Sequence, residues 1–62
     1  MGEKIRELRE KAKLSQEELA ERSGLSRVTI SFIETGKLES VTTKTLKQIA
    51  EALGVSVKIF FS

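Results

Sequence analysis

The chain has 62 residues, among which Cys, His, Pro and Trp are all absent. Without Cys or His it can form neither a disulfide nor a zinc site, and it lacks the thiolate and imidazole groups on which much nucleophilic and general-base catalysis depends. We therefore expect one domain with no enzymatic activity, no metal and no cofactor. Eleven basic and nine acidic residues give a net charge of +2, which permits an anionic partner without requiring one.

Targeting and membrane signals are missing from the sequence. No apolar run approaches the roughly 20 residues that a membrane-spanning helix needs, and no charged-then-apolar leader opens the chain. We therefore expect a cytoplasmic protein that does not contact a membrane.

The first helix is predicted over residues 3–12. Ile5, Leu8 and Ala12 recur at the spacing of one helix face, whereas glutamate, lysine and arginine residues occupy the other positions. This pattern is typical of a helix that buries one side against a core.

The second helix is predicted over residues 16–23. Ser15 and Glu18 have the Ser-x-x-Glu spacing of a capping box, which satisfies the free N–H groups at a helix start. Gly24 suits the left-handed backbone position that ends a helix.

The third helix is predicted over residues 27–34, with Ser26 as its N-cap and Gly36 shortly after its end. It is separated from the second helix by only three residues, of which one is glycine. Two short helices joined by such a turn form a helix-turn-helix pattern.

A fourth helix is predicted over residues 43–53 after a looser stretch at 36–42. Thr42 or Thr43 would cap it, and Gly54 would end it. Its apolar stripe consists of Leu46, Ile49, Ala50 and Leu53.

In the last segment, residues 55–61, the spacing of the apolar residues differs from that of the helices. Apolar residues alternate at every second position and most are β-branched or aromatic, which favours a strand. Because a single strand leaves its backbone groups unpaired, we expect it to pair with the same strand of a second copy. The alternative is a short fifth helix capped by Ser56.

Residues 15–37, SQEELAERSGLSRVTISFIETGK, resemble the lambda-repressor-like, XRE-type family of helix-turn-helix DNA-binding domains, and the likeness extends over about residues 1–54. A small residue, Ala20, stands where the two helices cross, and Ile30 and Ile33 form an i, i+3 pair that would hold the third helix against the core. The residues that carry the resemblance are Gln16, Ala20, Gly24, Ile30, Ile33, Glu34, Gly36 and Lys37.

The resemblance implies that the third helix enters the major groove of DNA. Phosphates would be contacted by Ser15, Gln16 and Lys37, while the outward residues of the third helix would face base edges. Lys44 is either a further phosphate contact or an ordinary exposed lysine. The full DNA-binding set is Ser15, Gln16, Ser26, Arg27, Val28, Thr29, Ser31, Phe32 and Lys37.

The resemblance also implies a structural ion pair between Arg9 and Glu34.

Two residues depart from the usual pattern of the family. Ser23 replaces an aliphatic residue, so we expect its hydroxyl to bond back to the helix. Phe32 stands i, i+4 from Val28, and it either contacts thymine methyl groups, forms a partner surface, or tucks under the 36–42 loop.

The predicted fold is therefore mainly α: a four-helix, lambda-repressor-like helix-turn-helix domain over residues 1–62, with a C-terminal β-strand that pairs across a homodimer. The dimerisation residues would be Val55, Val57, Ile59, Phe60 and Phe61. The predicted function is a sequence-specific transcriptional regulator, a repressor that binds a palindromic operator in double-stranded DNA.

Three further expectations concern the partners and the setting. The terminal strand makes the chain similar to antitoxin-type (HipB-like) members of the family, which adds a toxin protein as a partner. The alternative function is a protein-interaction or dimerisation module of the same fold that reads no bases. The family resemblance implies a bacterial, archaeal or phage-encoded protein associated with the nucleoid.

Overall fold

A computed structural model describes residues 1–38 and 40–61 of the chain. Residue 39, within the predicted loop 36–42, and residue 62, at the end of the predicted domain 1–62, lie outside the described residues.

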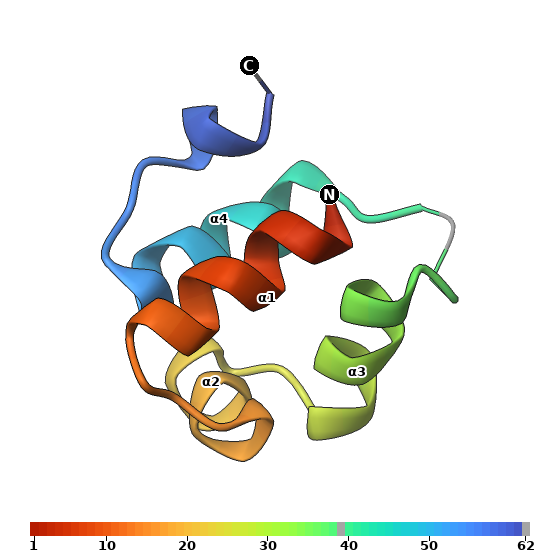
Figure 1. Ribbon diagram of the computed structural model, residues 1–62. Helices are drawn as coiled ribbons and strands as arrows, with labels where there is room; N and C mark the ends of the chain where they lie inside the picture. Colours follow the sequence, from red (N-terminus) through yellow and green to blue (C-terminus); the bar gives the residue numbers. More distant parts are fainter. Residues whose placement is uncertain (39, 62) are drawn as a thin grey trace.

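Four α-helices make up most of the fold (Figure 1). They are α1 (Gly2–Lys11), α2 (Gln16–Ser23), α3 (Arg27–Thr35) and α4 (Thr43–Leu53). The prediction of a mainly α-helical chain with four helices is confirmed. The bounds of α2 and α4 are those predicted, α1 lies one residue earlier, and α3 is one residue longer.

Hydroxyl side chains start the last three helices. Ser15, Ser26 and Thr42 each accept a hydrogen bond from the backbone N–H three residues later. The capping box of α2 is complete, because the Glu18 carboxylate also accepts a hydrogen bond from the Ser15 N–H at 2.9 Å. That backbone hydrogen bond holds the pKa of Glu18 below its ordinary value of 4.5.

All four helices end in the same motif. The backbone is left-handed directly after α2, α3 and α4, at Gly24, Gly36 and Gly54, and two residues after α1, at Lys13. The next N–H then donates to the carbonyl oxygen five residues back, as in Leu14 to Arg9 at 3.1 Å and Lys37 to Phe32 at 2.9 Å. This is a Schellman motif, which satisfies carbonyl groups at the helix end. The sequence signalled three of these ends by glycine, but Lys13 gave no such signal.

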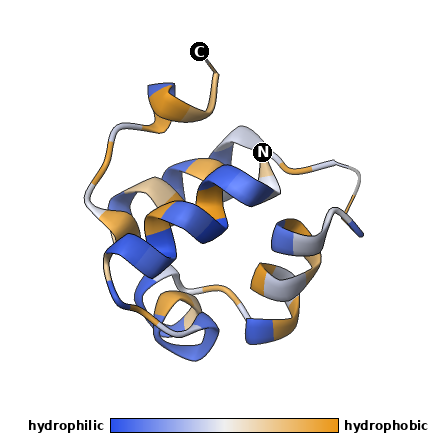
Figure 2. Cartoon of the chain, in the orientation of Figure 1, coloured by the Kyte–Doolittle hydropathy of each residue, from blue (hydrophilic) through white to orange (hydrophobic). Residues whose placement is uncertain are grey.

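The core receives buried side chains from every helix. They are Ile5 from α1, Leu19 and Ala20 from α2, Ile30 and Ile33 from α3, and Leu46 and Ile49 from α4. Figure 2 shows hydrophilic residues concentrated on α1 and α2 and fewer on α3. The surface of α3 therefore differs from that of its neighbours in carrying few charges.

The start of α1 passes closely over the end of α3. A Cβ atom placed on Gly2 would collide with the backbone carbonyl oxygens of Ile33 and Glu34. The absence of a side chain at Gly2 therefore allows α1 to fix the position of α3.

The predicted strand at residues 55–61 is wrong, because Val57–Phe60 form a 3-10 helix capped by Ser56. Residues three apart share a face in a 3-10 helix, so Val57 and Phe60 both pack against the core. A strand would have turned these two residues to opposite faces. The same change leaves Phe61 60% exposed, whereas the alternating pattern would place it with Val55, Val57 and Ile59 on the apolar face of a strand.

Candidate nucleic-acid interface

The turn between α2 and α3 is short and is closed by a backbone hydrogen bond. Gly24 adopts a left-handed backbone, and the Leu25 N–H donates to the Ala20 carbonyl oxygen at 3.1 Å. Ala20 is itself buried, so no large side chain separates the two helices. The turn thus fixes α3 at a set orientation relative to α2.

One face of α3 is anchored in the core. Ile30 is fully buried and Ile33 is 3% exposed. The hydroxyl of Ser23 donates to the Ala20 carbonyl oxygen at 3.2 Å, which confirms the expected bond back to the helix, and Gln48 of α4 donates to the Ser23 carbonyl oxygen at 3.2 Å. The burial of Ile30 and Ile33 leaves the opposite face of α3 exposed to solvent.

The exposed residues of α3 are Arg27, Val28, Phe32 and Thr35. The Arg27 guanidinium makes no hydrogen bond or ion pair with any residue that the structure describes, so all its donors face solvent. Ser31 is half-buried. The face therefore combines one unpaired cation with apolar and hydroxyl groups.

Two predicted contact residues, Ser26 and Thr29, also serve the fold. The hydroxyl of Ser26 accepts from the Thr29 N–H at 3.1 Å, and the two hydroxyl oxygens lie 2.8 Å apart. Each hydroxyl keeps further capacity to donate or accept a hydrogen bond. Both roles, as a helix cap and as a polar contact surface, are therefore compatible.

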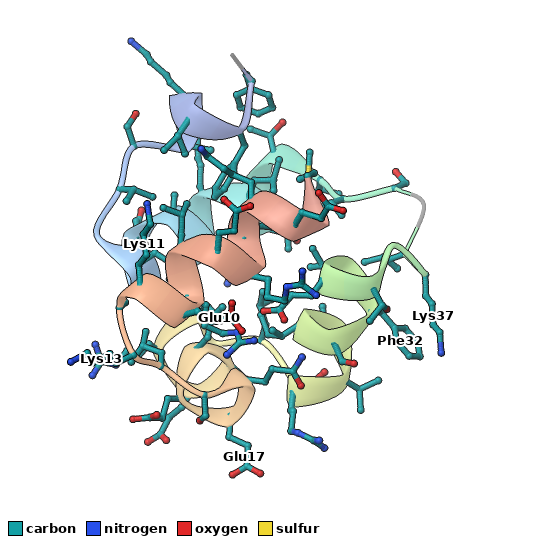
Figure 3. All side chains as sticks on the ribbon, in the orientation of Figure 1. Glu10, Lys11, Lys13, Glu17, Phe32 and Lys37 are labelled. Atoms are coloured by element: carbon teal, nitrogen blue, oxygen red, sulfur yellow. The ribbon has the colours of Figure 1, made fainter. Side chains whose placement is uncertain are left out.

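Phe32 does not tuck beneath the following loop, because its side chain is 41% exposed. Instead, the Nζ atom of Lys37 lies over the ring, 5.9 Å from its centroid. Figure 3 shows both side chains on the same outer side of α3. Sequence reasoning treated these two residues separately and missed their contact.

Ser15 and Gln16 lie at the start of α2, close to the end of α3. The Ser15 side chain is exposed and already accepts the Glu18 N–H at 3.0 Å. The Gln16 amide nitrogen donates to the Glu34 carboxylate at 3.1 Å, which leaves its second N–H available. This hydrogen bond was not predicted, although both residues belong to the motif that carries the family resemblance.

Glu34 also forms an ion pair with Arg9, so the structure brings the two predicted members of the pair together. Arg9 donates from Nε and Nη2 to the two carboxylate oxygens at 2.6 and 3.0 Å. The side chains are 12% and 2% exposed. A third hydrogen bond joins Arg9 Nη1 to the Leu14 carbonyl oxygen at 2.8 Å. The hydrogen bonds to Glu34 raise the pKa of Arg9 above its ordinary value.

Other kinds of site are not indicated in the part of the chain that the structure describes. It contains no group of three or more acidic residues arranged to hold a metal ion. No helix in residues 1–38 and 40–61 is long and apolar enough to cross a membrane. Two hollows of about 290 and 220 Å³ both border Met1, and neither is lined by the outward residues of α3.

Comparison with known proteins identifies relatives of this chain. A family model described as helix-turn-helix matches residues 5–60. The chain is 46% identical over 54 residues to the HTH-type transcriptional repressor RghR of Bacillus subtilis (strain 168), and the match covers 87% of this chain and 40% of that protein. It is 39% identical over 61 residues to the HTH-type transcriptional regulator PuuR of Escherichia coli (strain K12), covering 98% of this chain and 32% of that protein.

A third relative is an uncharacterized HTH-type transcriptional regulator of Mycobacterium tuberculosis (strain ATCC 25618 / H37Rv). It is 43% identical over 60 residues, covering 97% of this chain and 42% of the relative. The chain thus spans between 32% and 42% of the length of these three relatives.

Proposed function

Because the chain belongs to the XRE-type helix-turn-helix family, whose model matches residues 5–60, we propose that it is a sequence-specific DNA-binding transcriptional regulator. In this proposal α3 enters the major groove and the chain represses transcription by occupying its operator. The names of the three relatives, which are all transcriptional regulators or repressors, support this function.

The observation that carries the proposal is the division of α3 into a buried and an exposed face. Ile30 and Ile33 hold one face in the core, while Arg27 stands unpaired among the described residues on the other. A guanidinium in the major groove can donate two hydrogen bonds to O6 and N7 of a guanine. We assign this role to Arg27.

The remaining contacts follow from side-chain chemistry. Thr29 and Ser31 would hydrogen-bond to base edges, and Val28, which is 57% exposed, would contact a thymine methyl group together with Phe32. Ser15, Gln16 and Lys37 would bind phosphates, with Ser26 at the start of α3 and Lys44 in the first turn of α4 as further polar contacts.

A dimer on a palindromic operator is the second part of the proposal. One helix of nine residues reaches few base pairs, and two copies related by a two-fold axis would read two half-sites about 34 Å apart. Exposed apolar side chains suited to such a contact remain near the chain ends. Met1 is 56% exposed and borders a hollow with Ile59 and Phe60, and Phe61 is 60% exposed.

A toxin partner is not retained in the proposal. That expectation depended on a terminal strand, whereas Val57–Phe60 form a 3-10 helix. The DNA-binding assignment does not depend on this segment, because all the assigned contact residues lie between Ser15 and Lys44.

Selection of bound sequences from a random pool of duplex DNA tests the function most broadly. We expect one enriched motif with inverted symmetry, and binding to random duplex that weakens steeply with salt as phosphate contacts release counterions. A chain that enriches no sequence and shows no salt dependence would instead be a protein-interaction module of the same fold.

A further inference from the structure

The contact between Phe32 and Lys37 has a structural cause in the end of α3. The Gly36 N–H donates to the Ile33 carbonyl oxygen at 3.3 Å, and the Lys37 N–H donates to the Phe32 carbonyl oxygen at 2.9 Å. These two bonds form a Schellman motif, in which the side chains at the positions of Phe32 and Lys37 normally make an apolar contact. Here the contact is made by an aromatic ring and a lysine.

The geometry allows a cation–π interaction. The Lys37 Nζ lies 5.9 Å from the centre of the Phe32 ring, within the reach of about 6 Å for this interaction. Among residues 1–38 and 40–61, Lys37 forms no ion pair with a carboxylate that would draw the ammonium elsewhere. Of the groups that the structure describes, the Phe32 ring is the one against which the ammonium lies.

We propose that Phe32 is a positioning residue for Lys37, and that the ring holds the Lys37 ammonium beside α3, ready to bind a DNA phosphate. This rests on the proposed DNA-binding function. A free lysine has a flexible four-carbon stem and loses conformational freedom when it binds a phosphate. A lysine already held by a ring and by a backbone motif loses less, so it binds more tightly for the same phosphate contact.

This role differs from base reading and predicts a different dependence on sequence. If Phe32 acts through Lys37, it contributes to binding of every duplex, because phosphates carry no base identity. If Phe32 only touches a thymine methyl group, its contribution is confined to operators with thymine at one position.

The test is a set of variants measured on random-sequence duplex at several salt concentrations. Phe32→Leu keeps an apolar side chain but removes the ring, and we expect it to lower affinity about two- to fivefold. Phe32→Tyr keeps the ring face and should retain the affinity. In the Lys37→Ala background, Phe32→Leu should have no further effect, because the lysine that the ring positions is gone.

Val28→Ala provides the matched control. Val28 is also exposed on α3, so its substitution should change affinity by the same factor with Lys37 or with alanine at that position. The proposal would be overturned if Phe32→Leu lowered affinity equally in both backgrounds. It would also be overturned if Phe32→Leu affected only thymine-containing operators and lost that effect when uracil replaced thymine.

A measurement without DNA separates this proposal from the function on which it rests. The ε-methylene protons of Lys37 should resonate upfield in the wild-type chain, because they are bonded next to an Nζ atom that lies over the ring, and should return to ordinary values in Phe32→Leu. Unshifted protons would overturn the positioning role while leaving DNA binding intact. Shifted protons in a chain whose binding to duplex is absent would overturn the function and the phosphate role together.

Discussion

Glu34 joins three helices through one carboxylate. It stands in the last turn of α3, accepts two hydrogen bonds from Arg9 of α1 and accepts a third from Gln16 at the start of α2. Because its side chain is 2% exposed, the carboxylate is stabilised by these donors instead of by water. The network therefore fixes where the end of α3 lies relative to the proposed phosphate contact at Gln16.

Breaking this ion pair should destabilise the fold through the charge that is left behind. We expect Arg9→Met or Glu34→Met alone to reduce the free energy of unfolding by about 3 kcal/mol. The double variant should lose less than the sum, by more than about 0.5 kcal/mol, since it leaves neither charge buried. Denaturant unfolding of the four proteins of this cycle provides the measurement.

Arg6 supplies the control for that cycle, because it lies on the same helix and is exposed. The effects of Arg6→Met and Glu34→Met on the free energy of unfolding should be additive. Additive effects in the Arg9 cycle as well would show that the pair contributes nothing specific to stability.

Side-chain contacts at this scale were only partly predictable. The i, i+3 spacing of Ile30 and Ile33 was sufficient to predict the buried face of α3, because periodicity reports burial directly. The Gln16–Glu34 hydrogen bond depends on how α2 and α3 meet in space. Sequence spacing carries no such information.

At the scale of elements, the four helices followed from local signals and the C-terminal segment did not. Ser15, Ser26 and Thr42 cap helices as their positions predict, since a hydroxyl at a helix start satisfies a free N–H. In residues 55–61, alternating β-branched residues favour a strand, yet the side chains that reach the core are Val57 and Phe60, three apart. Packing against α4 thus outweighed the local preference, as is common for β-propensity.

Substitutions of two adjacent phenylalanines distinguish the 3-10 helix from the predicted strand. In the 3-10 helix, Phe60 packs on the core and Phe61 is exposed, so Phe60→Ala should reduce the free energy of unfolding by about 2–4 kcal/mol. Phe61→Ala should change it by less than about 0.5 kcal/mol. Thermal unfolding at a protein concentration low enough to avoid association would measure both. A larger loss for Phe61→Ala would restore the strand, which places Phe61 on its apolar face.

At the scale of the whole molecule, the exposed apolar residues fall into two groups. Val28 and Phe32 lie on α3 and Leu38 follows it, whereas Met1 and Phe61 lie at the two ends of the chain. Figure 1 shows the C-terminal segment away from α3, whereas the start of α1 passes over the end of α3. Self-association through Phe61 would therefore use a different surface from DNA binding through α3, and the two could occur together.

Self-association through the chain ends is testable without DNA. Phe61→Ser removes an exposed ring that makes little contact with the core, so we expect a folded monomer in sedimentation equilibrium where the wild-type chain is a dimer. Val28→Ser removes a side chain of similar exposure from α3 and should leave the dimer intact. A Phe61→Ser chain that still sediments as a dimer would move the interface elsewhere.

The claim that α3 reads bases in DNA is tested most directly by comparing Arg27→Ala with Lys37→Ala on a selected operator and on random duplex. We expect Arg27→Ala to lose about 1–3 kcal/mol of binding free energy on the operator and to relax the preference at one base pair. Lys37→Ala should weaken binding to both duplexes alike and reduce the salt slope by about one. If the two variants lost affinity uniformly on operator and random DNA, Arg27 would not be a base-reading residue and the account of α3 would be contradicted.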